Sequence, residues 1–348
     1  MPLMNLQTLL NIELPIIQAP MAGVQDGAMT VAVSNVGGLG SLPCGMLDCD
    51  AIREQLLAIT AQSDKPFNVN LFCHKPPEAT AEHQSAWHDA LLPYYQEYGI
   101  DVDVIPAGAG RTPFNSETAD VLEEFKPAVV SFHFGLPNAA LLERVKSWGA
   151  KVLSTATTVE EALWLEARGA DAIIAQGLEA GGHRGMFLSQ DLTTQTGTFA
   201  LVPQIVKAVS VPVVAAGGIA DAKGVSAALA LGASGVQVGT AYLLCPEATT
   251  RKVHCAALKS EAARHTAITN LFSGGPARGI VNRIMNELGA INAVAPPYPL
   301  ASSGLAPLRA AGEDQDSGDF SPLWCGQNAG GCKEISAAEI TRALAAGL

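Results

Sequence analysis

One histidine stands among glycines in a pattern that suggests chemistry. His183 lies in the phrase QGLEAGGHRG, residues 176–185, which directly follows an apolar run. Glycines on both sides let the backbone lie close against a flat group. Because an imidazole exchanges protons near neutral pH, we expect His183 to give or take a proton or a hydrogen bond at a site. A purely structural histidine is the competing interpretation.

A second histidine, His133, occurs in the phrase SFHFGLP near the end of another apolar run. Side chains alternate between the two faces of a strand, so His133 should share a face with Ser131 and oppose Phe132 and Phe134. Its place near a strand end makes His133 a candidate partner of His183. A histidine hydrogen-bonded inside the protein is the alternative.

Side-chain amides lie at or near the ends of two apolar runs, and a turn follows a third. Asn70 and Gln176 can each donate and accept hydrogen bonds, which suits a ring with donors and acceptors along its edge. The first run leads into a turn containing Met21 and Ala22, whose backbone could pass beneath such a ring.

Two glycine-containing turns late in the chain are suited to a phosphate. AGGI at 216–219 precedes a helix that Asp221 should begin, and QVGT at 237–240 ends the last run. Glycines let backbone N–H groups approach a phosphate closely, and a helix N-terminus favours its charge. Relief of crowding at strand ends is the alternative reason for these glycines.

Eight short runs rich in Val and Ile position these residues. They are near-continuous, as in parallel strands buried on both faces, and a helix-compatible segment separates each successive pair. We therefore predict an α/β fold, a (β/α)8 TIM barrel, in which functional groups gather at the carboxyl ends of the strands. A doubly wound open sheet is the alternative, although neither GxGxxG nor GxxxxGK[ST] opens a helix. The predicted strands are Ile16–Pro20, Leu39–Pro43, Phe67–Phe72, Ala128–Phe134, Lys151–Thr155, Ala172–Gln176, Val211–Ala216 and Gly235–Gly239.

Two regions are longer than the connections of a simple barrel require. Residues 74–126 are long for one connection and include a helical stretch. Residues 247–290 suggest helices broken by the turn SGGPARG. We predict a barrel domain over 1–246, a small helical cap over 247–295 beside the barrel mouth, and a C-terminal return onto the barrel over 296–348.

Composition and charge exclude several classes of partner. The 348 residues carry a formal net charge of −12 and no basic run, so nucleic acid and anionic membranes are poor partners. There is no stretch of 18 apolar residues and no signal-peptide pattern, which favours a cytoplasmic protein without a membrane span. Any anionic ligand must be held by local donors.

Cysteine usage indicates neither disulfides nor a metal. The seven cysteines are scattered and contain no CxxC pair. Cys325 and Cys332 flank the phrase GQNAGG, but this spacing fits a zinc ligand pair poorly. We expect reduced thiols and no metal site.

Several phrases, taken together and in order, resemble the nitronate monooxygenase family, formerly called 2-nitropropane dioxygenases, in its bacterial class I type. The resemblance runs essentially from end to end, and SFHFGLP is its most discriminating phrase. The C-terminal stretches PYPLASSGLAPLRAA and GDFSPLWCGQNAGG are also similar to bacterial members. The other matching phrases are QAPMAG at 18–23, FNVNLF at 67–72, QGLEAGGHRG at 176–185, VVAAGGIAD at 213–221 and VQVGTAYL at 236–243.

The resemblance implies an FMN enzyme. His183 falls on the family's catalytic histidine and His133 on a histidine often found near the flavin. Tyr298 and Arg309 are further candidates for contacting the substrate, although a solvated surface charge is the alternative for Arg309. The residues implied to hold FMN are Met21, Ala22, Asn70, Gln176, Gly181, Gly218, Gln237, Val238, Gly239 and Thr240.

The implied reaction is oxidation of an alkyl nitronate, such as propionate 3-nitronate, with molecular oxygen to a carbonyl compound and nitrite. Two alternatives remain at this stage. The same barrel and glycine-caged histidine occur in FMN-dependent NAD(P)H:quinone reductases and enoyl-thioester reductases, and fold alone does not decide function. A non-catalytic flavin-binding module is the second alternative. We expect a monomer or homodimer.

Overall fold

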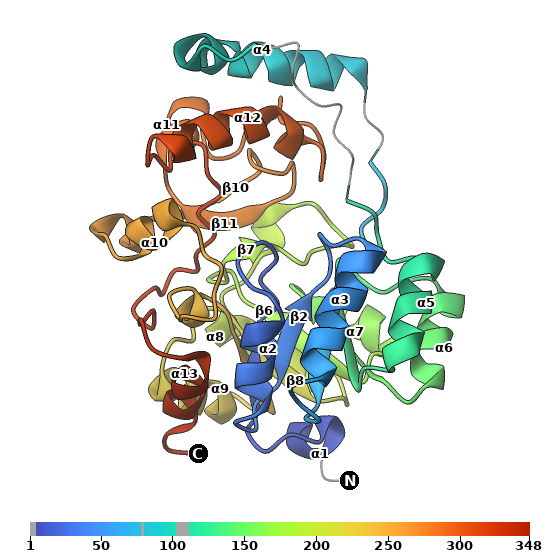
Figure 1. Ribbon diagram of the computed structural model, residues 1–348. Helices are drawn as coiled ribbons and strands as arrows, with labels where there is room; N and C mark the ends of the chain where they lie inside the picture. The colour runs from blue at the N-terminus through green and yellow to red at the C-terminus, as the bar shows by residue number, and fades with distance from the viewer. Residues whose placement is uncertain (1–4, 78–79, 102–110) are drawn as a thin grey trace.

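Eight parallel strands form a barrel in the computed structural model, which describes residues 5–77, 80–101 and 111–348 (Figure 1). Their order is β1-β9-β8-β6-β5-β4-β3-β2. The two end strands are joined through Leu39, which accepts from Gln18 N and donates to Ile16 O, each at 2.9 Å. The TIM-barrel prediction is therefore confirmed, and the open sheet is wrong. The strands are β1 (Ile16–Gln18), β2 (Gly40–Pro43), β3 (Phe67–Phe72), β4 (Val129–His133), β5 (Lys151–Ala156), β6 (Ala172–Gln176), β8 (Val213–Ala216) and β9 (Gly235–Val238).

Helices surround the barrel, and side-chain caps fix where most of them begin. Asp26, Asn138 and Asp221, for example, each accept a hydrogen bond from a backbone amide in the first turn of the following helix. Such caps satisfy amides that have no partner within the helix. The surrounding helices are α2 (Gly27–Ser34), α3 (Cys49–Thr60), α5 (Ser116–Phe125), α6 (Ala139–Ser147), α7 (Val159–Ala167), α8 (Thr198–Ala208) and α9 (Ala222–Ala230).

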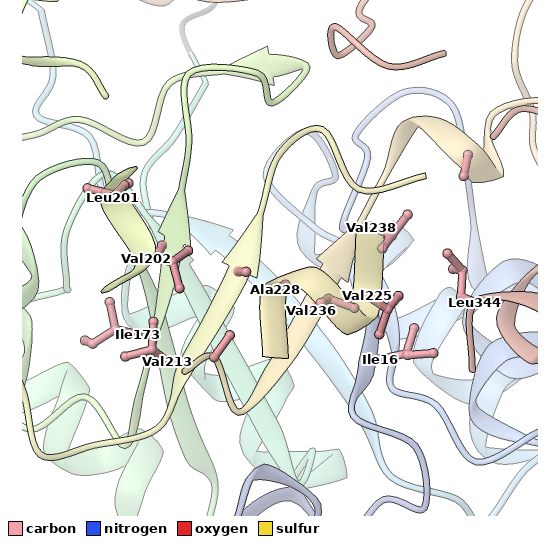
Figure 2. Packing of buried hydrophobic residues seen from close by; sticks show 14 of the residues in the cluster. Ile16, Ile173, Leu201, Val202, Val213, Val225, Ala228, Val236, Val238 and Leu344 are labelled. Carbon is pink, nitrogen blue, oxygen red and sulfur yellow. The ribbon is translucent and has the colours of Figure 1, made fainter. Parts of the chain in front are cut away.

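The strands are buried on both faces, which explains their near-continuous apolar runs. Ile173, Val213 and Val236 pack outward against the helices, as Figure 2 shows. Inside the barrel, Ile174 and Val214 pack in a separate cluster with Leu6 of α1 (Leu6–Leu10), which covers one end. Both chain ends lie toward that end, with α13 (Ala337–Ala345) on the outside (Figure 1). The opposite end is left for the functional groups.

A second layer lies over that opposite end (Figure 1). The helix predicted within residues 74–126 is α4 (Ala81–Tyr98), and its Trp87 and Tyr95 share an apolar cluster with Leu305 of α12 (Ala301–Asp314) and Met285 of α11 (Arg283–Leu288). The cap therefore gathers segments that are far apart in the sequence. Its other helical elements include α10 (Lys252–Leu258).

The prediction that residues 247–290 are helical between their turns is partly wrong. Two strands, β10 (Thr266–Thr269) and β11 (Ala277–Ile280), pair antiparallel, and β11 pairs with the short strand β7 (Gly182–His183) from the barrel. These strands are only four residues long, and the pairing of β11 with β7 joins distant segments, so local patterning did not reveal them. The boundaries at 246 and 295 remain a proposal. Among the described residues, no helix is long and apolar enough to cross a membrane.

Candidate active site

His183 lies at the junction of the barrel and the cap. Its strand β7 follows β6, and Ala277 of β11 is its pairing partner. The His183 Nε2 shares a 2.7 Å hydrogen bond with the hydroxyl of Ser273, which the cap supplies. Gly182 has a φ of +71°, and a Cβ there would meet nothing within 4 Å. The histidine is thus held both by the barrel and by the cap.

Tyr298 is the centre of a cluster of rings around His183. Its ring centroid lies 5.2 Å from that of His183, 5.0 Å from that of His74 and 5.2 Å from that of Phe134. Trp324 packs against His183 at 5.5 Å. Tyr298, a candidate for contacting the substrate, thus lies beside His183, and the cluster forms an apolar wall with polar ring edges.

Phe134 departs from the predicted alternation. The strand β4 ends at His133, and Phe134 has a φ of +68°, which is uncommon for a residue with a side chain. Its ring consequently contacts His133 at 4.6 Å instead of sharing a face with Phe132, which is buried under the helices. Strained backbone of this kind is often found at functional sites.

His133 supports the backbone of His183. Its Nε2 lies 3.2 Å from the carbonyl oxygen of His183, and its Nδ1 lies 3.0 Å from the hydroxyl of Thr155. Because a carbonyl only accepts, Nε2 carries the proton and Nδ1 accepts from Thr155. The two predicted histidines are brought together, but His133 acts on the main chain of its partner.

Both histidines are uncharged at neutral pH. Burial lowers the pKa of His133 to about 4. Burial also holds the pKa of His183 well below its ordinary value, and the nearby charge of Arg111 adds to this effect. His183 is therefore a weak base that can still donate or accept a hydrogen bond.

The loop that carries His183 is fixed by buried polar groups. The fully buried Arg184 donates to the carbonyls of Gln176 and Gly177 at 2.8 and 2.7 Å and to the side chain of Gln195 at 3.0 Å. The Gln176 amide donates to His183 O at 2.9 Å and accepts from Gly185 N at 2.8 Å. Gln176 thus holds the loop directly.

Sequence reasoning missed Arg111 and His74. Arg111 Nη1 donates to Tyr298 Oη at 3.1 Å, and its backbone oxygen lies 2.9 Å from His74 Nε2. His74 comes just after the end of β3, a position that parallel-barrel topology marks as functional. Arg111 carried no such signal, because it lies in an irregular segment.

The two predicted phosphate turns lie next to each other on the neighbouring strands β8 and β9. Gly217 and Gly218 have φ values of +119° and +75°, which residues with side chains rarely adopt. Gly239 precedes the 3-10 helix η3 (Thr240–Tyr242), and no side chain caps it. Uncapped amides there are available to an anion.

The C-terminal segment 325–328 crosses both turns, which the sequence did not indicate. Gly326 N donates to Thr240 Oγ1 at 3.0 Å, and Asn328 donates to Gly218 O at 3.0 Å. Gly181 lies directly beneath, because a Cβ there would come within 2.5 Å of Gly326 N. The segment therefore borders the predicted cofactor site.

The remaining residues predicted to hold the cofactor differ in burial and in hydrogen bonding. Asn70 is buried and donates to Ser131 Oγ at 2.9 Å. Met21 N donates to a glutamine side chain, and Ala22 lies half-buried in the same turn. The Val238 side chain packs in the core shown in Figure 2, so only its backbone faces the mouth.

Arg309 is not brought to this cluster. It lies on α12, where its Nε donates to Glu313 at 2.8 Å. No group of three or more metal-ligating side chains occurs within residues 5–77, 80–101 and 111–348.

Comparison with known proteins agrees with the barrel fold. The nitronate monooxygenase family profile matches residues 4–347. A nitronate monooxygenase of Pseudomonas aeruginosa is 43% identical over 97% of this chain and 96% of its own length. This chain belongs to the nitronate monooxygenase family. A second nitronate monooxygenase, from Paraburkholderia phytofirmans, is 42% identical over 97% of this chain and 92% of its own length.

A solved structure supports the same relation. A nitroalkane oxidase from Streptomyces ansochromogenes matches with a TM-score of 0.89 and 36% identity, covering 98% of this chain and 96% of that one. The nitronate monooxygenase family consists of flavin-dependent oxidoreductases, so this chain is an oxidoreductase enzyme.

The residues at the mouth fit the flavin that the nitronate monooxygenase family uses. Gln237 Oε1 is buried and has no hydrogen-bond partner among the described residues, so a donor on a ring edge would satisfy it. Gly239 has no side chain. A Cβ at this position would lie 3.3 Å from Ala19 Cβ and 3.5 Å from Met21 Sδ, so glycine keeps the backbone accessible here. The glycine turns on β8 and β9 supply amides for a phosphate.

Proposed function

We propose that this chain is an FMN-dependent nitronate monooxygenase that oxidises alkyl nitronates, such as propionate 3-nitronate, with molecular oxygen to carbonyl compounds and nitrite. The observation that carries the proposal is a neutral, half-buried His183 beside Tyr298 and Arg111 at the mouth of a nitronate monooxygenase barrel. When bound, FMN would supply the electron-transfer chemistry.

The proposed cofactor contacts follow the placements above. Asn70, Gln176 and Gln237 would border the ring system, and the backbone of Met21 and Ala22 would pass beneath it. Gly218, Gly239 and Thr240 would hold the phosphate through main-chain amides, with the Val238 backbone alongside. Gly181 would leave room for the C-terminal segment that covers this region.

His183 is suited to an already deprotonated substrate. A base with a pKa well below the ordinary value of histidine removes a proton from carbon poorly. A neutral imidazole can nevertheless donate an N–H to a nitronate oxygen and orient the anion. We therefore propose that nitronates, rather than neutral nitroalkanes, are the preferred substrates.

His133 would keep that imidazole in place through the backbone. The 3.2 Å hydrogen bond from its Nε2 to His183 O fixes the main chain, and Ser273 fixes the ring. We accordingly assign His183 to substrate contact and His133 to positioning.

Nitrite formation and oxygen uptake with propionate 3-nitronate test the proposal. The wild-type protein should turn over this nitronate faster than 3-nitropropionate, in which the carbon beside the nitro group is still protonated. His183→Asn, with flavin still bound, should lose about a hundredfold or more in kcat. His88→Asn, on the exposed face of α4, is the matched control and should behave like wild type.

Two outcomes would contradict the proposal. Rapid anaerobic bleaching of the yellow protein by NADH, together with no reaction with propionate 3-nitronate, would instead indicate a quinone or enoyl-thioester reductase. Failure to turn over any of these compounds would indicate a flavin-binding module without catalysis.

A further inference from the structure

Ser273 is a buried residue of the cap that lies directly against His183. It follows β10 in the turn that leads to β11, and its hydroxyl lies 2.7 Å from His183 Nε2. The turn has little room to move, because the next residue, Gly274, has a φ of +89° and a Cβ there would collide with Pro296 O. The cap therefore holds the Ser273 hydroxyl in a fixed place beside the imidazole.

The proton in this hydrogen bond belongs to the serine. A donor–acceptor distance of 2.7 Å is typical of an O–H donor, whereas N–H donors usually lie at about 2.9–3.0 Å from an oxygen. Gly275 N already donates to Ser273 Oγ at 3.3 Å, so this oxygen needs no second donor. The hydroxyl hydrogen could otherwise reach Gly275 O, but that distance is 3.4 Å, which is too long to compete. Ser273 therefore donates to His183 Nε2.

The other ring nitrogen of His183 is left to meet a ligand. Burial holds the pKa of His183 well below its ordinary value, so the imidazole is neutral and carries one N–H. Because Nε2 accepts from Ser273, that proton is on Nδ1. In the described part of the chain, no group forms a hydrogen bond with Nδ1, and the side chain is only half-buried. An N–H without a partner at the barrel mouth is available to an anion.

We propose that Ser273 is a positioning residue that sets the tautomer of His183. Its hydroxyl donates to Nε2, the proton stays on Nδ1, and this N–H donates to an oxygen of the nitronate. With the opposite tautomer, Nδ1 would present a lone pair to an anion and repel it. The barrel carries the histidine, but the cap decides which of its nitrogens is a donor. This inference rests on the proposed function and deepens it by naming the donor atom and the residue that prepares it.

Nitrogen-15 NMR of the flavin-loaded protein, labelled on its histidines, tests the tautomer directly at pH 7.5. Signals that are absent from His183→Asn belong to His183. We expect wild type to carry the proton on Nδ1, and Ser273→Ala to shift it wholly or partly to Nε2, because the donor to Nε2 is gone. Ser273→Thr keeps a hydroxyl and should keep the wild-type tautomer. His133, whose Nε2 donates to a carbonyl, is the internal control and should not change.

Turnover of propionate 3-nitronate gives the second readout. We expect kcat/KM to fall about tenfold to a hundredfold in Ser273→Ala, and to fall less than about threefold in Ser273→Thr. The control is Ser226→Ala, on the exposed side of α9, which should behave like wild type.

A wild-type His183 protonated on Nε2 would overturn the inference, whether or not the variants fold. An unchanged tautomer in Ser273→Ala would do the same. If wild type oxidises no nitronate, the proposed function fails, and the NMR spectra still decide whether Ser273 sets the tautomer.

Discussion

Replacing Arg184 by methionine tests whether one buried guanidinium holds the loop that carries His183. Arg184 is fully buried and donates to three acceptors, Gln176 O, Gly177 O and the side-chain oxygen of Gln195. Methionine retains much of the apolar stem but no donor. The substitution therefore removes the hydrogen bonds with little change in packing volume.

The magnitude follows from the acceptors that remain. A buried acceptor that loses its donor costs about 1–3 kcal/mol. Gly177 O keeps a bond from Ala180 N, so its loss is small. Burial also disfavours the charged form of Arg184, whose pKa is lowered to about 10. The uncharged methionine has no such desolvation penalty, which offsets part of the lost stability. We expect the free energy of unfolding to fall by about 2–4 kcal/mol.

Urea denaturation followed by circular dichroism measures this loss. The control is Arg264→Met, because Arg264 is exposed and, among the described residues, its salt bridge is with the equally exposed Glu261. That change should stay within about 0.5 kcal/mol. We also expect Arg184→Met to lower kcat, because the His183 loop loosens. A loss in stability no larger than that of the control would refute the reasoning.

Three further predictions concern pH, the C-terminal segment and α12. Burial lowers the pKa of His133 and His254 to about 4, against about 6.5 in an unfolded chain, so the unfolded state binds more protons between these values. The free energy of unfolding should fall as the pH drops from about 6.5 to 4, and urea midpoints that do not fall would contradict this. Gly181→Ala places a Cβ 2.5 Å from Gly326 N, so we expect a lower melting temperature and less bound flavin, measured by absorbance. Arg309→Met should leave KM for propionate 3-nitronate within about twofold in steady-state assays, and a larger rise would place Arg309 at the site.

Much of this molecule was predictable from local sequence. The barrel follows from eight apolar runs buried on both faces, because such strands need a helix on one side and a core on the other. The glycine turns at 216–219 and 237–240 were recognisable because a left-handed or closely approached backbone requires glycine. His183 was identified by its glycine neighbours, and the structure places it at the mouth of the barrel.

The tertiary structure decided what surrounds His183. Its partner Ser273, the ring of Tyr298 and the guanidinium of Arg111 come from segments far apart in the sequence, and no local pattern links them. The strand pairing of β7 with β11 likewise depends on a contact between the barrel and the cap. Side-chain periodicity reports only which face of an element is buried, whereas a charge or a ring gains its role from neighbours that folding brings together.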